Sequence, residues 1–229
     1  MLPIAILAGG LGTRLWPATQ RLPKALVPVR GRPFVDYQLA LLRKNGFERA
    51  VFCVSYLGEM IEEYVGDGST QGMDIRYVYD GPERMGTAGA LKCALPQLGD
   101  QFSVIYGDSY LVCDYAAAER AFLDSRKTGL MTVYRNDNAL APSNVLFTDG
   151  TIRAYDKAHP TADMRHIDFG LSTFQRQAFD NVASDRPTDL ADVFHDLLKR
   201  GELAGYESTT RFYEVGTPEG IAELSAHLD

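Results

Sequence analysis

Two cations and three glycines follow the first apolar run of the chain. Gly9, Gly10 and Gly12 come directly after this run, and Arg14 and Lys24 lie shortly beyond them. Glycine lets backbone N–H groups point into a shared concavity that a Cβ would obstruct, and such concavities bind anions. Because the two side chains add full positive charges, the segment predicts a site for a phosphate-bearing ligand.

Three familiar phosphate-binding patterns do not fit this segment. A Walker A loop needs Gly-Lys-Ser/Thr at its end, whereas Gly12 is followed by Thr13. A dinucleotide fingerprint that starts at Gly10 has Leu15 in place of its third glycine. The tripeptide "DFG" at 168–170 lacks the other kinase motifs. The loop therefore belongs to another class of phosphate site.

Short β-branched and aromatic runs alternate with segments of helical period through the first 135 residues. This alternation predicts strands joined by crossover helices, in a three-layer α/β/α sandwich with a mixed, mostly parallel, Rossmann-like sheet. We expect Pro96 to stop one helix at residue 95, Asp114 to cap another, and Gly129 to end that helix. The expected strands are 3–8, 50–55, 75–79, 102–106 and 130–135, and the expected helices are 33–45, 57–65, 87–95 and 114–127.

The alternation stops after residue 135. Segments 144–147 and 151–155 flank the string "TDGT", which is typical of a β-hairpin, and 165–174 is expected to be extended. Two amphipathic helices are predicted at 189–199 and 218–228. The second half is therefore expected to add a mixed-sheet insertion and a second pocket.

The composition excludes some classes of partner. The chain of 229 residues has 23 Lys and Arg against 30 Asp and Glu, a net charge of −7, which disfavours a nucleic-acid or acidic-lipid surface. Cys53, Cys93 and Cys113 show no metal-site spacing and are expected to be reduced thiols. No run approaches the ~18 apolar residues of a membrane span. A cytoplasmic monomer or small homo-oligomer is expected.

Several longer motifs occur in a fixed order along the chain. They are "LAGGLGTRLWP", "LPKALVPV", "RPFVDYQLALLRKNG", "MGTAGALKCAL", "YGDSYL", "YDK", "IDFGL" and "EVGTPEGIAEL". In this order they resemble the sugar-1-phosphate nucleotidylyltransferases, the GT-A-like pyrophosphorylases, over most of the chain. The chain is most similar to their short bacterial branch of heptose-1-phosphate guanylyltransferases and N-acetylmuramate-1-phosphate uridylyltransferases. The resemblance implies a single domain, 1–229, in which 1–112 mainly binds the nucleotide and 113–229 mainly binds the acceptor.

The implied reaction is attack by a sugar 1-phosphate on the α-phosphorus of a nucleoside triphosphate, with release of pyrophosphate. The nucleophile has a second pKa of about 6 and needs no general base, so the protein must chiefly supply positive charge. The resemblance implies that Arg14 binds the β- and γ-phosphates, that Lys24 binds the α-phosphate or its bridging oxygen, and that Asp108 and Glu214 hold Mg²⁺. Relatives usually carry Asp where this chain has Glu214, so the longer side chain is expected to reach the ion through water or to shift it.

The nucleoside is expected to lie against the opening loop and the segment that begins the "GTAGAL" helix. The expected nucleotide-binding residues beside Arg14 and Lys24 are Leu7, Ala8, Gly9, Gly10, Gly12, Thr13, Asp80, Gly86, Thr87 and Ala88. Asp80 or Glu83 could accept from guanine N1 and N2 or from cytosine N4, which favours GTP over UTP. Either acid could equally be a solvated loop charge.

The acceptor is expected to bind residues of the second half. Asp156 and Lys157 resemble the family's Glu-Lys pair, with Lys157 on the sugar phosphate, and Asn144, Asp168 and Gly170 complete the expected set. Asp168 stands where relatives carry Asn, and a carboxylate has no N–H donor. This departure disfavours N-acetylmuramate 1-phosphate and favours a heptose or hexose 1-phosphate.

Two other readings remain open. One is a catalytically silent homologue that binds nucleotide as a regulator, which the joint presence of Arg14, Lys24 and Asp108 disfavours. The other is uridylyl or cytidylyl transfer to another phosphate, such as N-acetylmuramate 1-phosphate or phosphocholine; no aromatic cage for a quaternary ammonium is evident. The enzyme reading requires that Arg14, Lys24 and Asp108 converge on one ligand.

Overall fold

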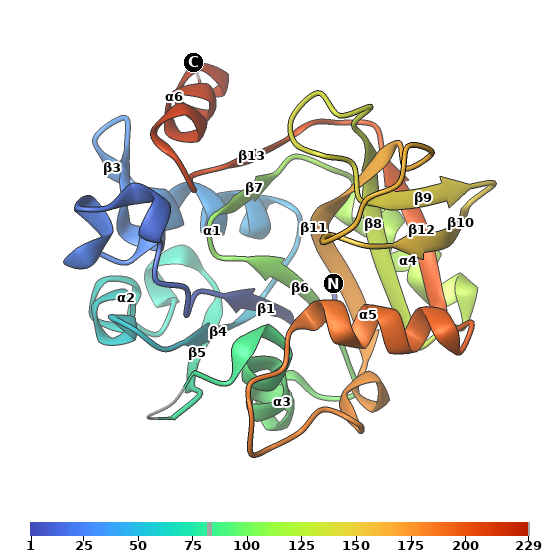
Figure 1. The fold of residues 1–229 in the computed structure, drawn as a ribbon. Coiled ribbons are helices and arrows are strands. Elements are labelled where there is room, and N and C mark those ends of the chain that lie inside the picture. Colours follow the sequence, from blue (N-terminus) through green and yellow to red (C-terminus); the bar gives the residue numbers. More distant parts are fainter. Residues whose placement is uncertain (82–83, 229) are drawn as a thin grey trace.

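The structure is a computed structural model that describes residues 1–81 and 84–228, in which a central sheet lies between two layers of helices (Figure 1). The strands of the main sheet are β1 (Ile4–Leu7), β4 (Arg49–Val54), β5 (Asp74–Tyr79), β6 (Gln101–Tyr106), β8 (Gly129–Arg135), β9 (Val145–Thr148), β10 (Thr151–Tyr155), β11 (His166–Gln175) and β12 (Leu203–Ser208). Seven of them run in the order β10-β9-β11-β6-β1-β4-β5, and β8 joins β12 to β11. The helices are α1 (Phe34–Lys44), α2 (Gly58–Val65), α3 (Gly86–Leu98), α4 (Tyr115–Ser125), α5 (Leu190–Lys199) and α6 (Pro218–His227).

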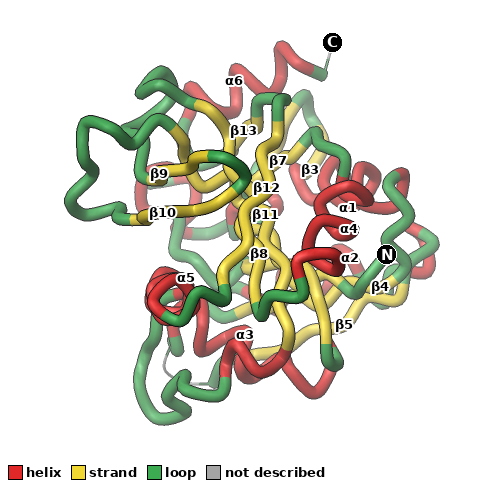
Figure 2. The backbone as a smooth tube through the Cα atoms, turned by 90° about the vertical axis from the view of Figure 1, so that its right-hand side faces the viewer, coloured by secondary structure: helices red, strands yellow, loops and turns green. Residues whose placement is uncertain are grey.

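The central strands are buried on both faces. In β1, Ile4 and Ile6 join one apolar cluster and Ala5 joins the other, because successive side chains of a strand point to opposite faces. Helices α1, α2 and α4 pack on the first face, and α3 and α5 pack on the second (Figure 2). The predicted three-layer α/β/α sandwich is therefore confirmed.

Parallel pairing brings two functional segments to the same edge of the sheet. β1 pairs parallel with β4 on one side and with β6 on the other. The chain leaves β1 into the glycine loop and leaves β6 towards Asp108. Carboxyl ends of adjacent parallel strands form the usual ligand site of such sheets.

The second half contains the predicted hairpin, and the structure adds strands that the sequence pattern did not reveal, among them β12 and two strands of three residues. β9 and β10 pair antiparallel, and Asp149 and Gly150 between them have φ of 50° and 72°, as a type I′ turn requires. β7 (Ser109–Leu111) pairs antiparallel with β13 (Phe212–Glu214), and Glu214 lies opposite Ser109. This small ladder returns the end of the chain to the carboxyl end of β6.

Helix boundaries follow local capping, with two corrections. Asp114 accepts from Ala117 N at 2.8 Å, which confirms the predicted cap. The helix nevertheless ends at Ser125, because Arg126 takes a left-handed conformation, and Gly129 begins β8 instead of ending the helix.

Pro96 lies inside α3, so the prediction that this helix stops before Pro96 is wrong. Proline removes one backbone hydrogen bond, but here the loss falls in the last turn of the helix. Leu95 and Leu98 of the same turn are buried in the core, which favours its continuation.

No helix in the described part of the chain has the length and apolar character that crossing a membrane requires. Cys53, Cys93 and Cys113 are all free thiols.

Candidate active site

The side chains of Thr19 and Lys24 pack closely against the backbone of the glycine loop that follows β1. Gly12 has φ of 65°, and Thr19 Oγ1 donates to its carbonyl oxygen at 2.7 Å. A Cβ at Gly12 would lie 2.9 Å from Lys24 Cγ. Glycine is thus required both for the left-handed turn and for the packing of the Lys24 stem.

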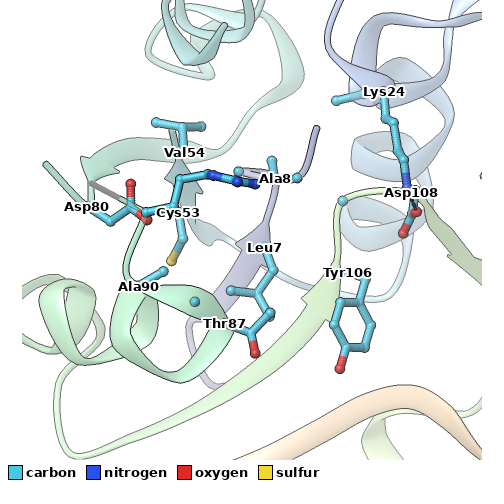
Figure 3. Close-up of a pocket in the computed structure, with 16 residues that line it drawn as sticks. Leu7, Ala8, Lys24, Cys53, Val54, Asp80, Thr87, Ala90, Tyr106 and Asp108 are labelled. Carbon is cyan, nitrogen blue, oxygen red and sulfur yellow. Dashed lines mark hydrogen bonds and ion pairs between the residues drawn. The ribbon is translucent and has the colours of Figure 1, made fainter. Parts of the chain in front are cut away.

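Lys24 and Asp108 form an ion pair at the carboxyl end of the sheet. Lys24 Nζ lies 2.7 Å from Asp108 Oδ2, and each side chain is less than one fifth exposed. In Figure 3 the two side chains meet end to end at one side of a cavity. A partly shielded, charge-assisted hydrogen bond of this kind fixes both groups where a phosphate could reach them.

Arg14 and Glu214 lie close to the Lys24–Asp108 ion pair. A Cβ at Gly216 would lie 3.0 Å from Arg14 Nη2 and 3.7 Å from Asp108 Oδ2, so the guanidinium and the carboxylate flank this glycine. The structure therefore brings together the three residues on which the enzyme reading depends.

The Glu214 carboxyl keeps access to solvent, yet its pKa is raised. The largest cause of the rise is desolvation of the carboxyl by the surrounding protein, and the negative charge of Asp108 raises the pKa further. The positive charges of Arg14 and Lys24 lower it. Val215 N donates to Asp108 O at 2.8 Å, which holds the two acidic segments side by side. Mutual repulsion of two carboxylates is the environment that a divalent cation relieves.

The donor set fits a divalent metal ion that is held jointly with substrate. Among the described residues there is no cluster of three or more potential metal ligands. Mg²⁺ is commonly bound through one or two carboxylates together with water and substrate phosphates. Asp108 and Glu214 supply such a pair of hard oxygen donors.

A cavity of about 280 Å³ lies beside these charges. Eight of the predicted nucleotide-binding residues line it: Leu7, Ala8, Gly9, Gly10, Lys24, Asp80, Gly86 and Thr87. In Figure 3, Asp80 and Cys53 lie at one side of the cavity, and Lys24 and Asp108 lie at the other. The cavity thus has one end with paired charges, suited to phosphates, and another end that carries the Asp80 carboxylate.

Four predicted residues lie outside the cavity lining. Gly12, Thr13 and Arg14 belong to the loop beside it, and Ala88 is fully buried. The backbone N–H of Ala88 donates to Thr188 O at 3.0 Å, so it is engaged within the protein.

Sequence reasoning missed part of the cavity wall. Ala25, Cys53, Val54 and Arg84 line it, and Tyr106 lies below Asp108 at the charged end (Figure 3). Cys53 and Val54 end a strand next to β1, so the strand order is the signal that could have found them.

Asp80 presents one unpaired oxygen. Its Oδ2 accepts from Met85 N at 3.0 Å, while its Oδ1 is buried and has no hydrogen-bond partner among the described residues. A buried acceptor without a partner is costly unless a ligand or water satisfies it. The other acid considered for the base, Glu83, lies outside the described residues.

Most of the expected acceptor residues form a second polar cluster. Asp168 Oδ2 lies 3.6 Å from Lys157 Nζ, and the Asp168 side chain is only 4% exposed. Its backbone N–H donates to Asn144 Oδ1 at 3.1 Å, and its Oδ1 accepts from Gly170 N at 3.0 Å. Asp156 is placed differently: its carboxylate accepts from backbone N–H groups of the following turn, which lower its pKa.

Tyr106 connects the two groups of residues. A Cβ at Gly170 would lie 3.5 Å from the Tyr106 ring, and Tyr106 also lines the cavity. Burial raises the pKa of Tyr106 well above its usual value, and the charges of Asp168 and Asp108 act in the same direction. The acceptor cluster and the charged end of the cavity therefore share this residue as a common wall.

The glycine loop, the cavity at the strand ends and the paired charges define an α/β protein that handles phosphorylated ligands. The chain matches the nucleotidyl transferase family over residues 4–229 and belongs to that family. The resemblance inferred from the motifs is confirmed, and the protein is an enzyme of nucleotidyl transfer.

Three comparisons illustrate the relationship. The chain is 28% identical over 225 residues to the N-acetylmuramate α-1-phosphate uridylyltransferase of Neisseria meningitidis and covers 96% of each sequence. It is 27% identical over 215 residues to the D-glycero-α-D-manno-heptose 1-phosphate guanylyltransferase of Campylobacter jejuni, covering 93% of this chain and 94% of the relative. The solved structure of HddC from Yersinia pseudotuberculosis complexed with GMP-PN superposes with a TM-score of 0.81 at 23% identity, covering 100% of both chains.

Proposed function

We propose that the protein is a Mg²⁺-dependent sugar-1-phosphate nucleotidylyltransferase that prefers GTP and accepts a heptose or hexose 1-phosphate. The observation that carries this proposal is the Lys24–Asp108 pair, 2.7 Å long, at the charged end of the cavity. It lies where an α-phosphate must meet an incoming phosphate if both ligands bind as the residues suggest.

The reaction follows from these positions. A phosphate oxygen of the sugar 1-phosphate forms a bond to the α-phosphorus, the bond from that phosphorus to the bridging oxygen breaks, and pyrophosphate leaves with the bonding electrons. Arg14 binds the β- and γ-phosphates in this scheme, Lys24 neutralises the α-phosphate, and Lys157 binds the sugar phosphate. These fixed cations reduce the repulsion between two polyanions.

Asp108 and Glu214 would hold the metal ion. Enzymes of this family generally use a divalent metal, and two carboxylate donors favour Mg²⁺. When bound, the ion supplies positive charge against the α-phosphate and the leaving pyrophosphate. Lys24 keeps Asp108 oriented through its hydrogen bond.

The preference for guanine rests on Asp80 and Arg84. The unpaired Oδ1 of Asp80 suits the N1 and N2 donors of guanine, and Arg84, which lines the same cavity, suits the O6 acceptor. Uracil offers a single N–H donor, so it would make fewer hydrogen bonds to the Asp80 carboxylate than guanine does.

The acceptor preference rests on Asp168. Its buried carboxylate accepts hydrogen bonds and is paired with Lys157, so it suits sugar hydroxyls. An N-acetyl carbonyl would find no donor in this carboxylate. A plain heptose or hexose 1-phosphate is therefore favoured over N-acetylmuramate 1-phosphate.

A coupled assay of pyrophosphate release tests the proposal. Each of four nucleoside triphosphates is combined with Mg²⁺ and with heptose, mannose-type, glucose and N-acetylmuramate 1-phosphates, and initial rates are compared. Release that requires both GTP and a hydroxylated sugar phosphate is expected. Activity confined to N-acetylmuramate 1-phosphate would overturn the acceptor assignment, and binding without pyrophosphate release from any pair would support the regulatory alternative.

A thermal-shift series with the same nucleotides checks binding separately. A ligand at about 100 times its dissociation constant stabilises the folded protein by ~2.7 kcal/mol, so GTP with Mg²⁺ should give the largest rise in melting temperature. We expect residues 1–112 to carry most nucleotide contacts and residues 113–229 most acceptor contacts. We also expect a monomer or small homo-oligomer in the cytoplasm, where free thiols stay reduced.

A further inference from the structure

Helix α1 carries one buried polar residue on its core-facing side. Gln38 is 1% exposed, and its neighbours Val35, Leu39 and Leu42 are buried apolar residues. Burying an amide costs free energy unless its hydrogen-bonding groups find partners. What the Gln38 side chain bonds therefore explains its presence in this helix.

The Gln38 amide bonds to the turn that presents Asp108. Its Nε2 donates to Tyr106 O at 3.0 Å and to Ser109 O at 2.7 Å. Both N–H donors are thus used, which fixes the orientation of the amide. The two carbonyl groups bracket Gly107 and Asp108, so one side chain holds both ends of the turn.

Backbone bonds hold the rest of this turn. Gly107 N donates to Leu7 O at 2.9 Å, and Asp108 O accepts from Val215 N at 2.8 Å. These bonds tie the turn to β1 and to the segment after β13, and Gln38 ties it to α1. The Asp108 carboxylate therefore projects from a backbone that is held from three directions.

The oxygen atom of the same amide accepts no hydrogen bond from the described residues. This atom, Gln38 Oε1, is also buried. An unsatisfied buried acceptor lowers stability, so packing alone would favour an apolar residue of the same length. The two donated bonds are what the amide provides in return.

We propose that Gln38 is a positioning residue for the reaction. It holds the Asp108 turn in the position from which the Asp108 carboxylate contacts Lys24 and would bind the metal ion. This inference rests on the proposed role of Asp108. A displacement of about 1 Å at a reacting centre can cost 10²-fold in rate, so loss of both bonds acts on turnover without removing any ligand-binding group.

The test compares Gln38→Met with Leu42→Ala in the full chain. Gln38→Met keeps the length of the side chain and removes both donors, whereas Leu42→Ala loosens the same helix without touching the turn. Gln38→Met is expected to lower kcat at least tenfold, to change KM for GTP and for the sugar phosphate less than threefold, and to weaken Mn²⁺ binding in the presence of nucleotide, measured by electron paramagnetic resonance. Leu42→Ala is expected to lower the unfolding midpoint in urea and to keep kcat and Mn²⁺ affinity.

Each outcome decides one point. Wild-type kcat and Mn²⁺ affinity in Gln38→Met would overturn the positioning role, as would equal kcat losses in the two variants at equal stability. If Gln38→Met does not fold, Gln38→Asn, which keeps the amide but is too short to span both carbonyls, must show the same loss of kcat and Mn²⁺ affinity. A wild-type protein inactive with every substrate pair would refute the proposed function, while Mn²⁺ binding would still decide the role of Gln38.

Discussion

At the scale of single residues, the site consists of ion pairs partly shielded from water. Lys24 and Asp108 form one pair, and Lys157 and Asp168 form the other, with Asp168 almost fully buried. Removing one partner of a shielded pair leaves the other charge uncompensated, so substitutions here act on electrostatics as much as on contacts. Conservative changes that keep the shape of the side chain are therefore the informative ones.

Replacing Asp108 by Asn removes the charge that faces Lys24 and that would hold the metal ion in the proposed scheme. Turnover is expected to fall ~10²-fold or more with the fold retained, as loss of a metal contact implies. Steady-state kinetics and circular dichroism measure the two effects. Asp196→Asn, on the exposed side of α5, is the control and should keep wild-type turnover; near-normal turnover in Asp108→Asn would remove the metal assignment.

Replacing Asp80 by Asn tests the reading of the base. The amide places N–H donors against the donors of guanine, so kcat/KM for GTP relative to UTP is expected to fall at least tenfold, in line with ~1–3 kcal/mol for such contacts. Competition between the two nucleotides gives this ratio directly. Asp124→Asn, exposed on α4, serves as control. An unchanged ratio would show that the base is selected elsewhere.

At the scale of elements, the start of α3 is fastened to the start of α5. Ala88 N donates to Thr188 O, Thr188 N donates to Met85 O, and Leu190 N donates to Thr87 Oγ1 at 2.7 Å. The wall of the cavity at Gly86 and Thr87 is thereby anchored to a helix of the second half. Strain introduced at this junction is expected to lower both the free energy of unfolding and the affinity for nucleotide.

Gly86→Ala tests this connection. Gly86 has φ of 73°, and a Cβ there would lie 2.5 Å from Thr188 O. Urea unfolding is expected to show a loss of at least ~1 kcal/mol beyond that of Gly201→Ala, because both variants carry the left-handed penalty but only Gly86→Ala adds a clash. Gly201 has φ of 69° with nothing within 4 Å of its Cβ position. KM for GTP should rise only in Gly86→Ala; equal behaviour of the two variants would contradict the anchoring.

At the scale of the whole molecule, the two apolar faces of the sheet keep two thiols from ionising. Burial raises the pKa of Cys53 to about 12 and that of Cys113 to about 12. Cys93 is exposed. The rates at which the three thiols react therefore report how well the packed chain shields each of them from solvent.

At pH 8, the exposed Cys93 is expected to react quickly with a disulfide reagent, the half-buried Cys113 more slowly, and the buried Cys53 only when urea unfolds the protein. The raised folded-state pKa values also set a sign for stability. Above about pH 9 the unfolded thiols ionise while the folded ones remain neutral, so the unfolding midpoint should fall as pH rises from 9 towards 12. Rapid reaction of all three thiols at pH 8 would contradict the closed core.

The sequence by itself determined the features that depend on short stretches of chain. The alternation of strands and helices, the cap at Asp114, the hairpin around Gly150 and the glycine loop with Arg14 and Lys24 are local patterns. Periodicity, capping and turn chemistry act over a few residues, so they can be read without knowing the partners. The family likewise followed from motifs that lie within continuous segments.

Only the tertiary structure decided what lies beside what. β7 and β13 are three residues long and show no period, yet their pairing places Glu214 next to Asp108. The bracket of Gln38 around the Asp108 turn also joins segments far apart in sequence. Pairing of distant strands and burial of a polar side chain depend on the whole packed chain, because the free energy that favours them comes from contacts that no local pattern encodes.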